Sequence, residues 1–326
     1  MPDKSLVSIL IPVYNRERYI EETVRSALNQ TYSPIEIIVV DNCSSDNTWE
    51  AVARLASKDP RIRCFRNDRN IGPVRNWIAA AEHAAGEYCK ILWSDDLMSP
   101  RFVELAVDAF LHHDDLAFVY SSIEYINENS DVISKPFYTL GSAGLHDTEF
   151  FVRQSLVDDP RIPLSPGCAL FRTKDVQLNI LPNFPNRHDF DLANIAIGND
   201  LLLYLLSTLG KSSFYMIPEV HNYFRVHPGS ISLSEGRGKL FAFYKLAKCF
   251  FAATYVSRGR DRLISEMNAQ IWYYLMKHKT RPAGFVSISD FYPPGHKTAA
   301  TVSLASIVSM VFRGLLNSLR TPGNPA

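Results

Sequence analysis

The 326-residue sequence has few cysteines, no excess charge of either sign and no long apolar run at its N-terminus. Its five cysteines are widely separated and include no C-x-x-C pair, which argues against a disulfide framework and a cysteine-built zinc site. The 34 basic and 34 acidic residues balance, which disfavours nucleic acid as a partner. The apolar run before Pro12 is only about seven residues long, too short for a signal peptide or a membrane span. We therefore expect a cytoplasmic protein.

Two glycine-rich phosphate-binding motifs are also missing. No G-x-G-x-x-G follows the first predicted strand and no G-x-x-x-x-G-K-[ST] occurs, which argues against a dinucleotide cradle and a phosphate loop. A nucleotide bound by this chain would need its charge neutralised in another way, and a divalent cation, Mg²⁺ or Mn²⁺, is the expected means.

Apolar strand-like runs alternate with amphipathic helical segments over the first third of the chain. The predicted strands cover residues 6–13, 36–40, 62–65 and 88–93. The predicted helices cover residues 18–30, 46–57 and 74–85. This alternation predicts an α/β fold whose parallel sheet is covered by helices on both faces.

The rest of the chain is less regular. Ser99 and Pro100 predict the cap and first position of a helix that runs to residue 112, and a strand is expected over 116–125. Residues 127–161 are rich in turn-forming residues and weak in periodicity, which indicates irregular, acceptor-facing structure. Further helices are expected over 199–209, 241–255 and 266–277.

Polar side chains follow the predicted strands at the edge of the sheet where ligands bind in such folds. Asp95 and Asp96 come directly after the fourth strand. They offer the hard oxygen ligands that Mg²⁺ or Mn²⁺ prefers. The alternative is that they solvate the turn before the next helix, but Ser99 as a cap would make that role unnecessary.

The sequence resembles the inverting glycosyltransferases of family 2, which have the nucleotide-sugar-binding fold called GT-A. The segments that carry the resemblance are IPVYN, VVDNCSSDNT, the Arg75-Asn76 pair and the Asp-Asp pair after a strand, so it covers about the first 100 residues well. The resemblance implies a domain over 1–235, with a nucleotide-binding half (1–125) and an acceptor half (126–235). Residues 236–326 would form a C-terminal helical extension.

The resemblance also implies roles for single residues. Asp41 matches the carboxylate that recognises the base, Asp95 would lie near the ribose, and Asp96 would hold the metal. Ser94 stands where the family often has a further acid. The loop that wraps the nucleoside would be formed by Pro12, Val13, Tyr14 and Asn15.

The helix that carries Arg75 and Asn76 matches the one beneath the nucleotide. Arg75 is a candidate binder, and the alternative is a solvated helix face with a structural amide at Asn76.

Inversion at the anomeric carbon needs a base on the acceptor hydroxyl. Asp200 matches the Asp of the family's Glu-Asp pair and Asn199 replaces the Glu. The alternative is that Asp200 only caps the helix that follows. Three nearby residues are the alternative candidates for the base: His188, Asp189 and Asp191.

Arg225 and His227 resemble the family's R-x-H-x-x-S segment. Two residues apart in extended backbone, they would point to the same side and could stabilise the leaving diphosphate.

Residues 299–316 are apolar apart from a narrow stripe formed by Ser303, Ser306, Ser309 and Arg313. This pattern indicates a helix that either packs on the protein or makes peripheral contact with the inner face of the membrane.

The resulting hypothesis is an inverting, metal-dependent glycosyltransferase that moves a sugar from a nucleotide-diphosphate donor to a saccharide or lipid-linked acceptor. By resemblance, UDP-sugars are the favoured donors and cell-surface polysaccharide the product. The alternative is a non-catalytic nucleotide-sugar-binding or scaffold protein of a polysaccharide-assembly complex. A nucleotidyltransferase is disfavoured because no glycine-rich, arginine-containing loop follows the first strand.

Overall fold

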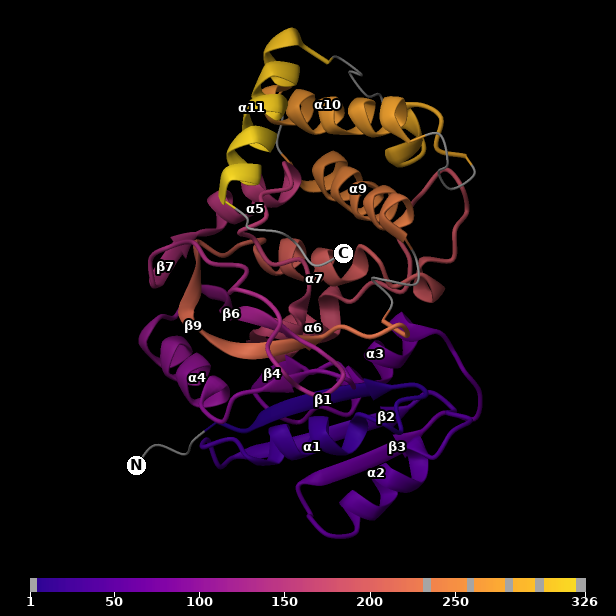
Figure 1. The fold of residues 1–326 in the computed structure, drawn as a ribbon, viewed down its shortest axis with the longest axis vertical. Coiled ribbons are helices and arrows are strands. Elements are labelled where there is room, and N and C mark those ends of the chain that lie inside the picture. The colour runs from indigo at the N-terminus through magenta and orange to yellow at the C-terminus, as the bar shows by residue number, and fades with distance from the viewer. Residues whose placement is uncertain (1–4, 231–235, 257–260, 279–283, 297–301, 321–326) are drawn as a thin grey trace.

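A single sheet of nine strands organises the protein (Figure 1). A computed structural model describes residues 5–230, 236–256, 261–278, 284–296 and 302–320. The strand order is β3-β2-β1-β4-β8-β6-β9-β5, with β7 paired to β9. The strands are β1 (Val7–Val13), β2 (Ile35–Asp41), β3 (Ile62–Arg66), β4 (Tyr88–Ile91), β5 (Leu97–Met98), β6 (Leu116–Ile126), β7 (Gly144–Asp147), β8 (Ala169–Arg172) and β9 (Ser213–Arg225).

Helices cover both faces of the sheet, as the alternating pattern predicts. They are α1 (Ile20–Leu28), α2 (Thr48–Ala56), α3 (Pro73–Glu82), α4 (Phe102–His112), α5 (Thr148–Leu156), α6 (Thr173–Asn179), α7 (Asn199–Ser207), α9 (Gly236–Tyr255), α10 (Asp261–Lys277) and α11 (Leu304–Arg320). Three short 3₁₀ helices are η1 (Pro166–Cys168), η2 (Leu192–Asn194) and η3 (Ile288–Phe291).

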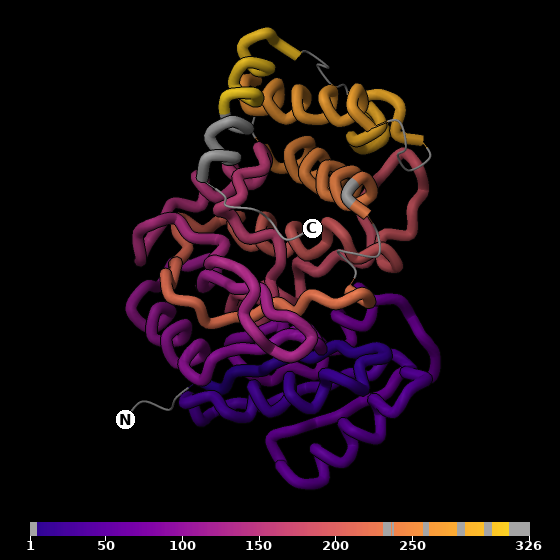
Figure 2. The backbone as a smooth tube through the Cα atoms, viewed as in Figure 1, coloured from indigo at the N-terminus to yellow at the C-terminus, as the bar shows by residue number. Residues whose placement is uncertain are grey.

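The two hydrophobic cores follow the alternation of side chains along β1. Ile9 and Ile11 point into the core that α1, α2 and α4 cover, and Leu10 points into the core on the other face. That second core continues through α3 and α7 into α9 and α10, where Phe243 and Met267 belong to it. Figure 2 shows the consequence: the indigo N-terminal strands and helices lie at one end of the molecule, and the orange and yellow C-terminal helices are stacked at the other.

Strand direction brings three distant segments to one edge of the sheet. Strands β3, β2, β1 and β4 are parallel. Strand β8 runs antiparallel to both β4 and β6, and β9 is parallel to β6. Strands β4, β6 and β9 therefore all point the same way, and the residues after Ile91, Ile126 and Arg225 emerge together.

Two local predictions are wrong. Ser99 is not the cap of α4, because the helix begins at Phe102 and the Ser99 hydroxyl is instead hydrogen bonded to His221 Nδ1 at 2.5 Å. The segment 127–161 is not irregular throughout, since it contains β7 and α5. Asp147 begins that helix, because its carboxylate accepts the backbone N–H groups of Glu149 and Phe150.

The C-terminal helices begin earlier than periodicity predicts, with α9 at Gly236 and α10 at Asp261. The predicted domain boundary at 235 falls in a segment outside the described residues, and the division of the chain into halves stays a prediction. Within the part of the chain that the structure describes, no helix is both long enough and apolar enough to cross a bilayer.

Candidate active site

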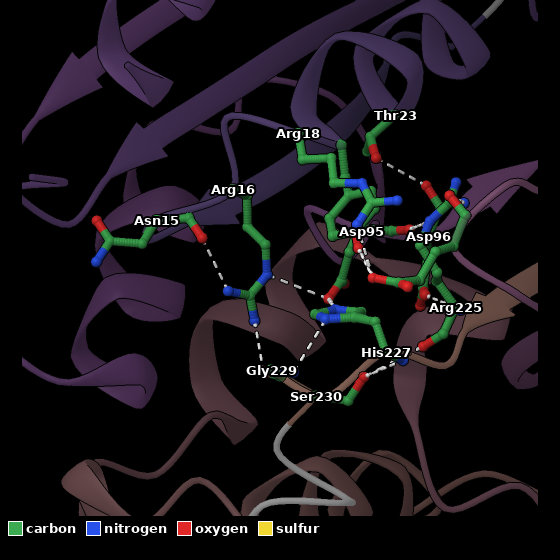
Figure 3. A network of polar contacts seen from close by, with 12 residues as sticks. Asn15, Arg16, Arg18, Thr23, Asp95, Asp96, Arg225, His227, Gly229 and Ser230 are labelled. Carbon is green, nitrogen blue, oxygen red and sulfur yellow. Dashed lines mark hydrogen bonds and ion pairs between the residues drawn. The ribbon is translucent and has the colours of Figure 1, made fainter. Parts of the chain in front are cut away.

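Asp95 and Asp96 lie where the ends of β4 and β9 meet, and Figure 3 shows their contacts. The Asp96 carboxylate accepts the backbone N–H of Arg225 at 2.8 Å, and its own carbonyl accepts the Thr23 hydroxyl at 3.0 Å. The Asp95 carboxylate accepts His227 Nε2 at 2.8 Å and Arg16 Nε at 3.2 Å. Residues 130 positions apart in the chain thus build one polar centre.

Arg225 holds this centre together from inside the protein. Its Nε donates to the Asp95 carbonyl at 2.7 Å and its Nη2 to Glu22 at 2.7 Å. Its Nη1 donates to Asn127, Glu128 and Ser130 in the turn after β6. The guanidinium is fully buried, so in this structure it faces the protein and not open solvent.

The proton on His227 can be placed from its partners. Nδ1 accepts the backbone N–H of Gly229 at 3.2 Å, so Nε2 carries the ring proton and donates it to Asp95. Arg16, which the sequence analysis did not identify, links the same elements because its Nη2 donates to the Gly229 carbonyl at 3.2 Å.

The two carboxyl groups have opposite electrostatic environments. Burial opposes ionisation of Asp95, but the hydrogen bond from His227 and the charge of Arg16 outweigh it and lower the pKa below the usual value. Burial and the neighbouring charge of Asp95 raise the pKa of Asp96 well above its usual value. The centre therefore carries negative charge on Asp95 and resists a second charge on Asp96.

The donor set suits a metal that is shared with a substrate. One oxygen of Asp96 accepts no hydrogen bond from the described residues, which leaves a buried hard ligand. Within those residues no group of three or more His, Cys, Asp or Glu side chains is arranged to hold a metal ion. The described residues therefore supply too few ligands to hold Mg²⁺ or Mn²⁺ alone. They fit such an ion only if substrate phosphates and water complete its coordination.

Asp41 ends β2 and is fully buried. Its carboxylate accepts the backbone N–H of Ser44 at 3.2 Å, bonds the Ser44 hydroxyl, and pairs with Arg66 Nε at 3.1 Å. The Ser44 hydroxyl in turn accepts the backbone N–H of Asn15 at 2.9 Å. The ends of β1 and β2 are thereby tied together.

The residues expected to wrap a nucleoside occupy two different environments. Pro12 and Val13 are not in a loop, because they are the last residues of β1 and are buried. Tyr14 is the first residue beyond the strand and its side chain is 42% exposed. Asn15 adopts a left-handed conformation with φ 51°, which asparagine tolerates better than most residues.

A network of asparagine amides, which the sequence analysis missed, shapes the loop between β3 and α3. Asn42 Oδ1 accepts from Asn67 at 3.1 Å and from the Ile71 N–H at 3.0 Å, and Asn42 Nδ2 donates to Asn70 at 2.9 Å. Beside Asp41 this loop borders an open hollow of about 560 Å³, whose lining residues are Arg66, Asn67, Asp68, Arg69 and Ile71.

Arg75 and Asn76 point in different directions. Arg75 pairs with Asp191 at 3.1 Å on the surface. The buried amide of Asn76 donates to the Val40 carbonyl at 3.0 Å and accepts from Asn67 at 2.8 Å. Asn76 is thus the structural amide of the alternative hypothesis. A role of Arg75 in binding a ligand stays a prediction.

Asp200 lies at the start of α7. Its Oδ1 accepts the backbone N–H groups of Gly198 and Leu201, both at 2.9 Å, and its Oδ2 accepts the Tyr244 hydroxyl at 2.6 Å. Burial is the main cause that raises its pKa to about 6, although all three hydrogen bonds favour the charged form. A carboxyl group with this pKa can accept a proton near neutral pH.

Gly198 lets the chain approach α9 closely enough for the contact to Tyr244. Its φ is +94°, and an added Cβ would lie 2.9 Å from both the Phe243 carbonyl oxygen and the Ala247 Cβ. Neighbouring Asn199 is buried, and neither atom of its amide has a hydrogen-bond partner among the described residues. A buried unpaired amide is costly unless another molecule satisfies it.

The three alternative candidates for the base either have other bonding partners or are exposed to solvent. His188 Nε2 is hydrogen bonded to the Asp290 carbonyl at 3.0 Å. Asp191 caps η2 and pairs with Arg75. Asp189 is exposed.

Three tyrosines connect Asp200 electrostatically with the carboxylate pair. Burial is the main cause that raises the pKa of all three, and nearby carboxylates add to it. Asp96 acts on Tyr125, whereas Asp200 acts on Tyr138 and Tyr244. Tyr125 also contributes to the raised pKa of Tyr138 and Tyr244, so the three phenols link the two acidic centres electrostatically.

Curated relatives resemble the first part of the chain. Over 132 residues it is 38% identical to chondroitin synthase of Pasteurella multocida (strain Pm70), which covers 40% of this chain and 14% of that protein. Over 130 residues it is 36% identical to the Escherichia coli UDP-Glc:alpha-D-GlcNAc-diphosphoundecaprenol beta-1,3-glucosyltransferase WfgD, covering 40% of this chain and 50% of that protein. The alignments thus span half or less of these relatives.

Solved structures resemble most of the chain. Residues 1–349 of S. aureus TarS in complex with UDP-GlcNAc superpose with a TM-score of 0.66 at 18% identity, covering 86% of this chain and 78% of that one. The complex of the same protein with UDP gives a TM-score of 0.62. This similarity shows the fold, and the predicted GT-A architecture is confirmed.

The family follows from the sequence profile. Residues 8–177, more than half of the chain, match the family described as Glycosyl transferase family 2. The match includes the ends of β1, β2 and β4, where Asn15, Asp41 and the Asp95–Asp96 pair lie. This chain belongs to glycosyltransferase family 2.

Proposed function

We propose that the protein is an inverting glycosyltransferase that moves a sugar from a UDP-sugar to a saccharide or lipid-linked acceptor in cell-surface polysaccharide biosynthesis. The observation that carries this proposal is the half-buried carboxyl group of Asp200, which is held by three hydrogen bonds at the start of α7. Its pKa of about 6 suits a general base.

In the proposed reaction Asp200 takes the proton of an acceptor hydroxyl. The acceptor oxygen forms a bond to the anomeric carbon from the face opposite the diphosphate. The bond between that carbon and the diphosphate oxygen breaks, and its electron pair leaves on the nucleotide. The product has the inverted configuration, and Asp200 releases its proton to water afterwards.

The carboxylate pair belongs to the leaving-group side. A bound Mg²⁺ or Mn²⁺ would neutralise the diphosphate charge, and Asp96 is the residue that would hold it. His227 orients Asp95 through its Nε2–H, and Arg225 fixes Asp96 through its backbone N–H. We propose that both residues support the departing diphosphate through these contacts.

The proposed preference for UDP rests on the named donors of similar proteins and on the hollow beside Asp41 at the end of β2. WfgD is named for a UDP-glucose donor and TarS was solved with UDP-GlcNAc. In this chain Asp41 stands beside the hollow bordered by the loop between β3 and α3. We propose that the uracil base occupies this hollow next to Tyr14. The lipid-linked acceptor is proposed by analogy with the diphosphoundecaprenol substrate in the name of WfgD.

Thermal denaturation with a panel of nucleotides tests the donor. UDP and UDP-sugars with Mn²⁺ should raise the Tm, because a ligand at 100 times its Kd stabilises the native state by about 2.7 kcal/mol. GDP-sugars and CMP-sugars are the matched controls and should give smaller shifts. Equal shifts with all nucleotides, or none with UDP-sugars, would contradict the proposed donor.

The pH profile of Tyr244→Phe tests Asp200 as the base. Wild-type kcat/KM should fall as the pH drops through about 6, where Asp200 becomes protonated. The Tyr244 hydroxyl stabilises the charged carboxylate, so its removal raises the pKa of Asp200. A hydrogen bond to a charged group is worth roughly 1.5–3 kcal/mol, and the acid limb should move upward by about one to two pH units.

Tyr32→Phe is the control for this experiment. It also removes one phenol hydrogen bond, to the Ser5 carbonyl at 2.7 Å, far along the chain from Asp200. Its pH profile should match the wild type. An unmoved acid limb in Tyr244→Phe would show that Asp200 does not set the profile.

A further inference from the structure

Helix α11 presents its two faces in an unusual way. Ser306 lies on the side of α11 that faces α10, where it is buried and donates to Ser265 at 2.8 Å. Ser303 is within hydrogen-bond distance of Ser306 at 2.8 Å, and Ser309 donates to Glu266 of α10 at 3.4 Å. The three serines that interrupt the apolar sequence therefore all bond to α10, and Ser306 is buried in this contact.

The apolar face of the same helix points outward. Leu304, Val308, Val311 and Phe312 are 77%, 60%, 52% and 62% exposed. Their spacing of four, three and one residues places them on one side of a helix. A monomeric protein rarely leaves such a row of large apolar side chains in water without a partner.

Helix α10 extends this apolar surface. Trp272, Tyr273 and Met276 are exposed, Met276 by 68%. They follow Ser265 by seven, eight and eleven residues and so lie on the side of α10 against which α11 packs. Figure 1 shows α11 crossing α10 at the end of the molecule farthest from α1 and α2. We call these seven residues of α10 and α11 the outer apolar face.

The charge of the C-terminal sequence, together with Lys277 on α10, indicates the partner of this face. The sequence from residue 291 to 326 contains no acidic residue but has cations at 297, 313 and 320, two of them within the bounds of α11. On α10 the exposed Lys277 lies over the Tyr273 ring at 5.6 Å. Exposed aliphatic side chains, Trp and Tyr, and an excess of cations form the combination that favours an anionic lipid surface.

We propose that the outer apolar face lies in the interface of an anionic lipid bilayer, with α11 parallel to the membrane plane. No described helix can span a bilayer, so the contact is peripheral. A second copy of the chain would meet the same excess of cations on its own face, and this repulsion disfavours a symmetric dimer through it.

This placement sets the orientation of the active site. Helix α9 packs on α7, which carries Asp200, and supplies Tyr244. Helix α10 packs through η3 on α9, and α11 packs on α10. The bilayer would therefore lie on the side of the molecule from which Asp200 is supported, opposite α1 and α2.

Vesicle flotation of the full chain tests the proposal without donor or turnover, so its outcome is independent of the proposed function. The protein should float with vesicles of phosphatidylglycerol and phosphatidylcholine at low salt. Binding to pure phosphatidylcholine should be at least about tenfold weaker, and high salt should weaken the binding to anionic vesicles. Equal binding to both vesicles, or none to either, would overturn the proposal.

A pair of variants makes the test specific. Val308→Asp with Phe312→Asp should lower binding at least about tenfold, because charged side chains replace two members of the outer apolar face. The matched control is Leu111→Asp with Leu178→Asp, which changes two exposed leucines on α4 and α6 and should bind as the wild type does. Circular dichroism and Tm should show that both doubles remain folded.

Light scattering decides between lipid and a second copy of the chain. The wild type should be monomeric at the concentration used for flotation. A wild-type dimer that Val308→Asp with Phe312→Asp converts to monomer would overturn the lipid assignment, as would vesicle binding that the double variant leaves unchanged.

Discussion

Asp200→Asn is expected to abolish most sugar transfer while leaving nucleotide binding intact. The amide keeps an oxygen that can accept the N–H groups of Gly198 and Leu201, so the start of α7 should hold its shape. It cannot take a proton from the acceptor, and loss of a general base typically costs 10²–10⁴-fold in rate. We expect kcat to fall by about this factor and the Kd for UDP to change little.

Asp191→Asn is the matched control. It makes the same chemical change nine residues earlier, at an exposed carboxylate paired with Arg75. Its transfer rate should stay near that of the wild type. If Asp191→Asn were the inactive variant, the base would be assigned to the wrong residue. If the wild type bound UDP-sugars without transferring them to any acceptor, the non-catalytic alternative would hold.

Removal of divalent metal should have the second large effect. Chelation should lower transfer at least about a hundredfold, and Mn²⁺ or Mg²⁺ should restore it, because a cation of this kind neutralises charge on the leaving diphosphate. Asp96→Asn should lose transfer and should also lose the metal-dependent tightening of UDP binding. Isothermal titration of UDP with and without Mn²⁺ measures the second effect directly.

Asp115→Asn provides the comparison for Asp96→Asn. Asp115 is exposed, pairs with Lys211 at 3.5 Å and lies at the start of β6, at the opposite end of the strand from the site. It should retain both metal-dependent binding and transfer. Full turnover after chelation would remove the metal role assigned to Asp96.

The sequence predicts the donor half of the fold better than the acceptor half. Strands β1 to β4 are short, mostly apolar segments between amphipathic helices, so their type and order can be recognised locally. The helix over 148–156 escaped prediction because turn-forming residues surround its short apolar pattern. Ser99 looks like a helix cap in the sequence, but a tertiary contact with His221, 122 residues away, takes its hydroxyl.

Candidate site residues could be found where they belong to a motif, and their partners could not. Asp41, Asp95 and Asp200 stand in recognisable segments. Tyr244 and Arg16 have no local signature, because only the packing of α9 on α7 and the pairing of β1 with β4 bring them to these carboxylates. The asparagine-rich run at 67–70 was a usable signal for the amide network, since amides that satisfy one another recur in tight loops.

Arg225 also has a consequence for how the protein folds. Its bond to Glu22 joins residues 203 positions apart, and its bond to Asp95 joins residues 130 apart. Contacts of such long sequence separation carry a high loop-closure entropy cost, which is associated with slow folding. The first 125 residues contain both members of the carboxylate pair, but Arg225 and His227 can contact them only once β9 has been synthesised and has paired with β6. A nascent chain that ends before β9 therefore holds both carboxyl groups without these partners.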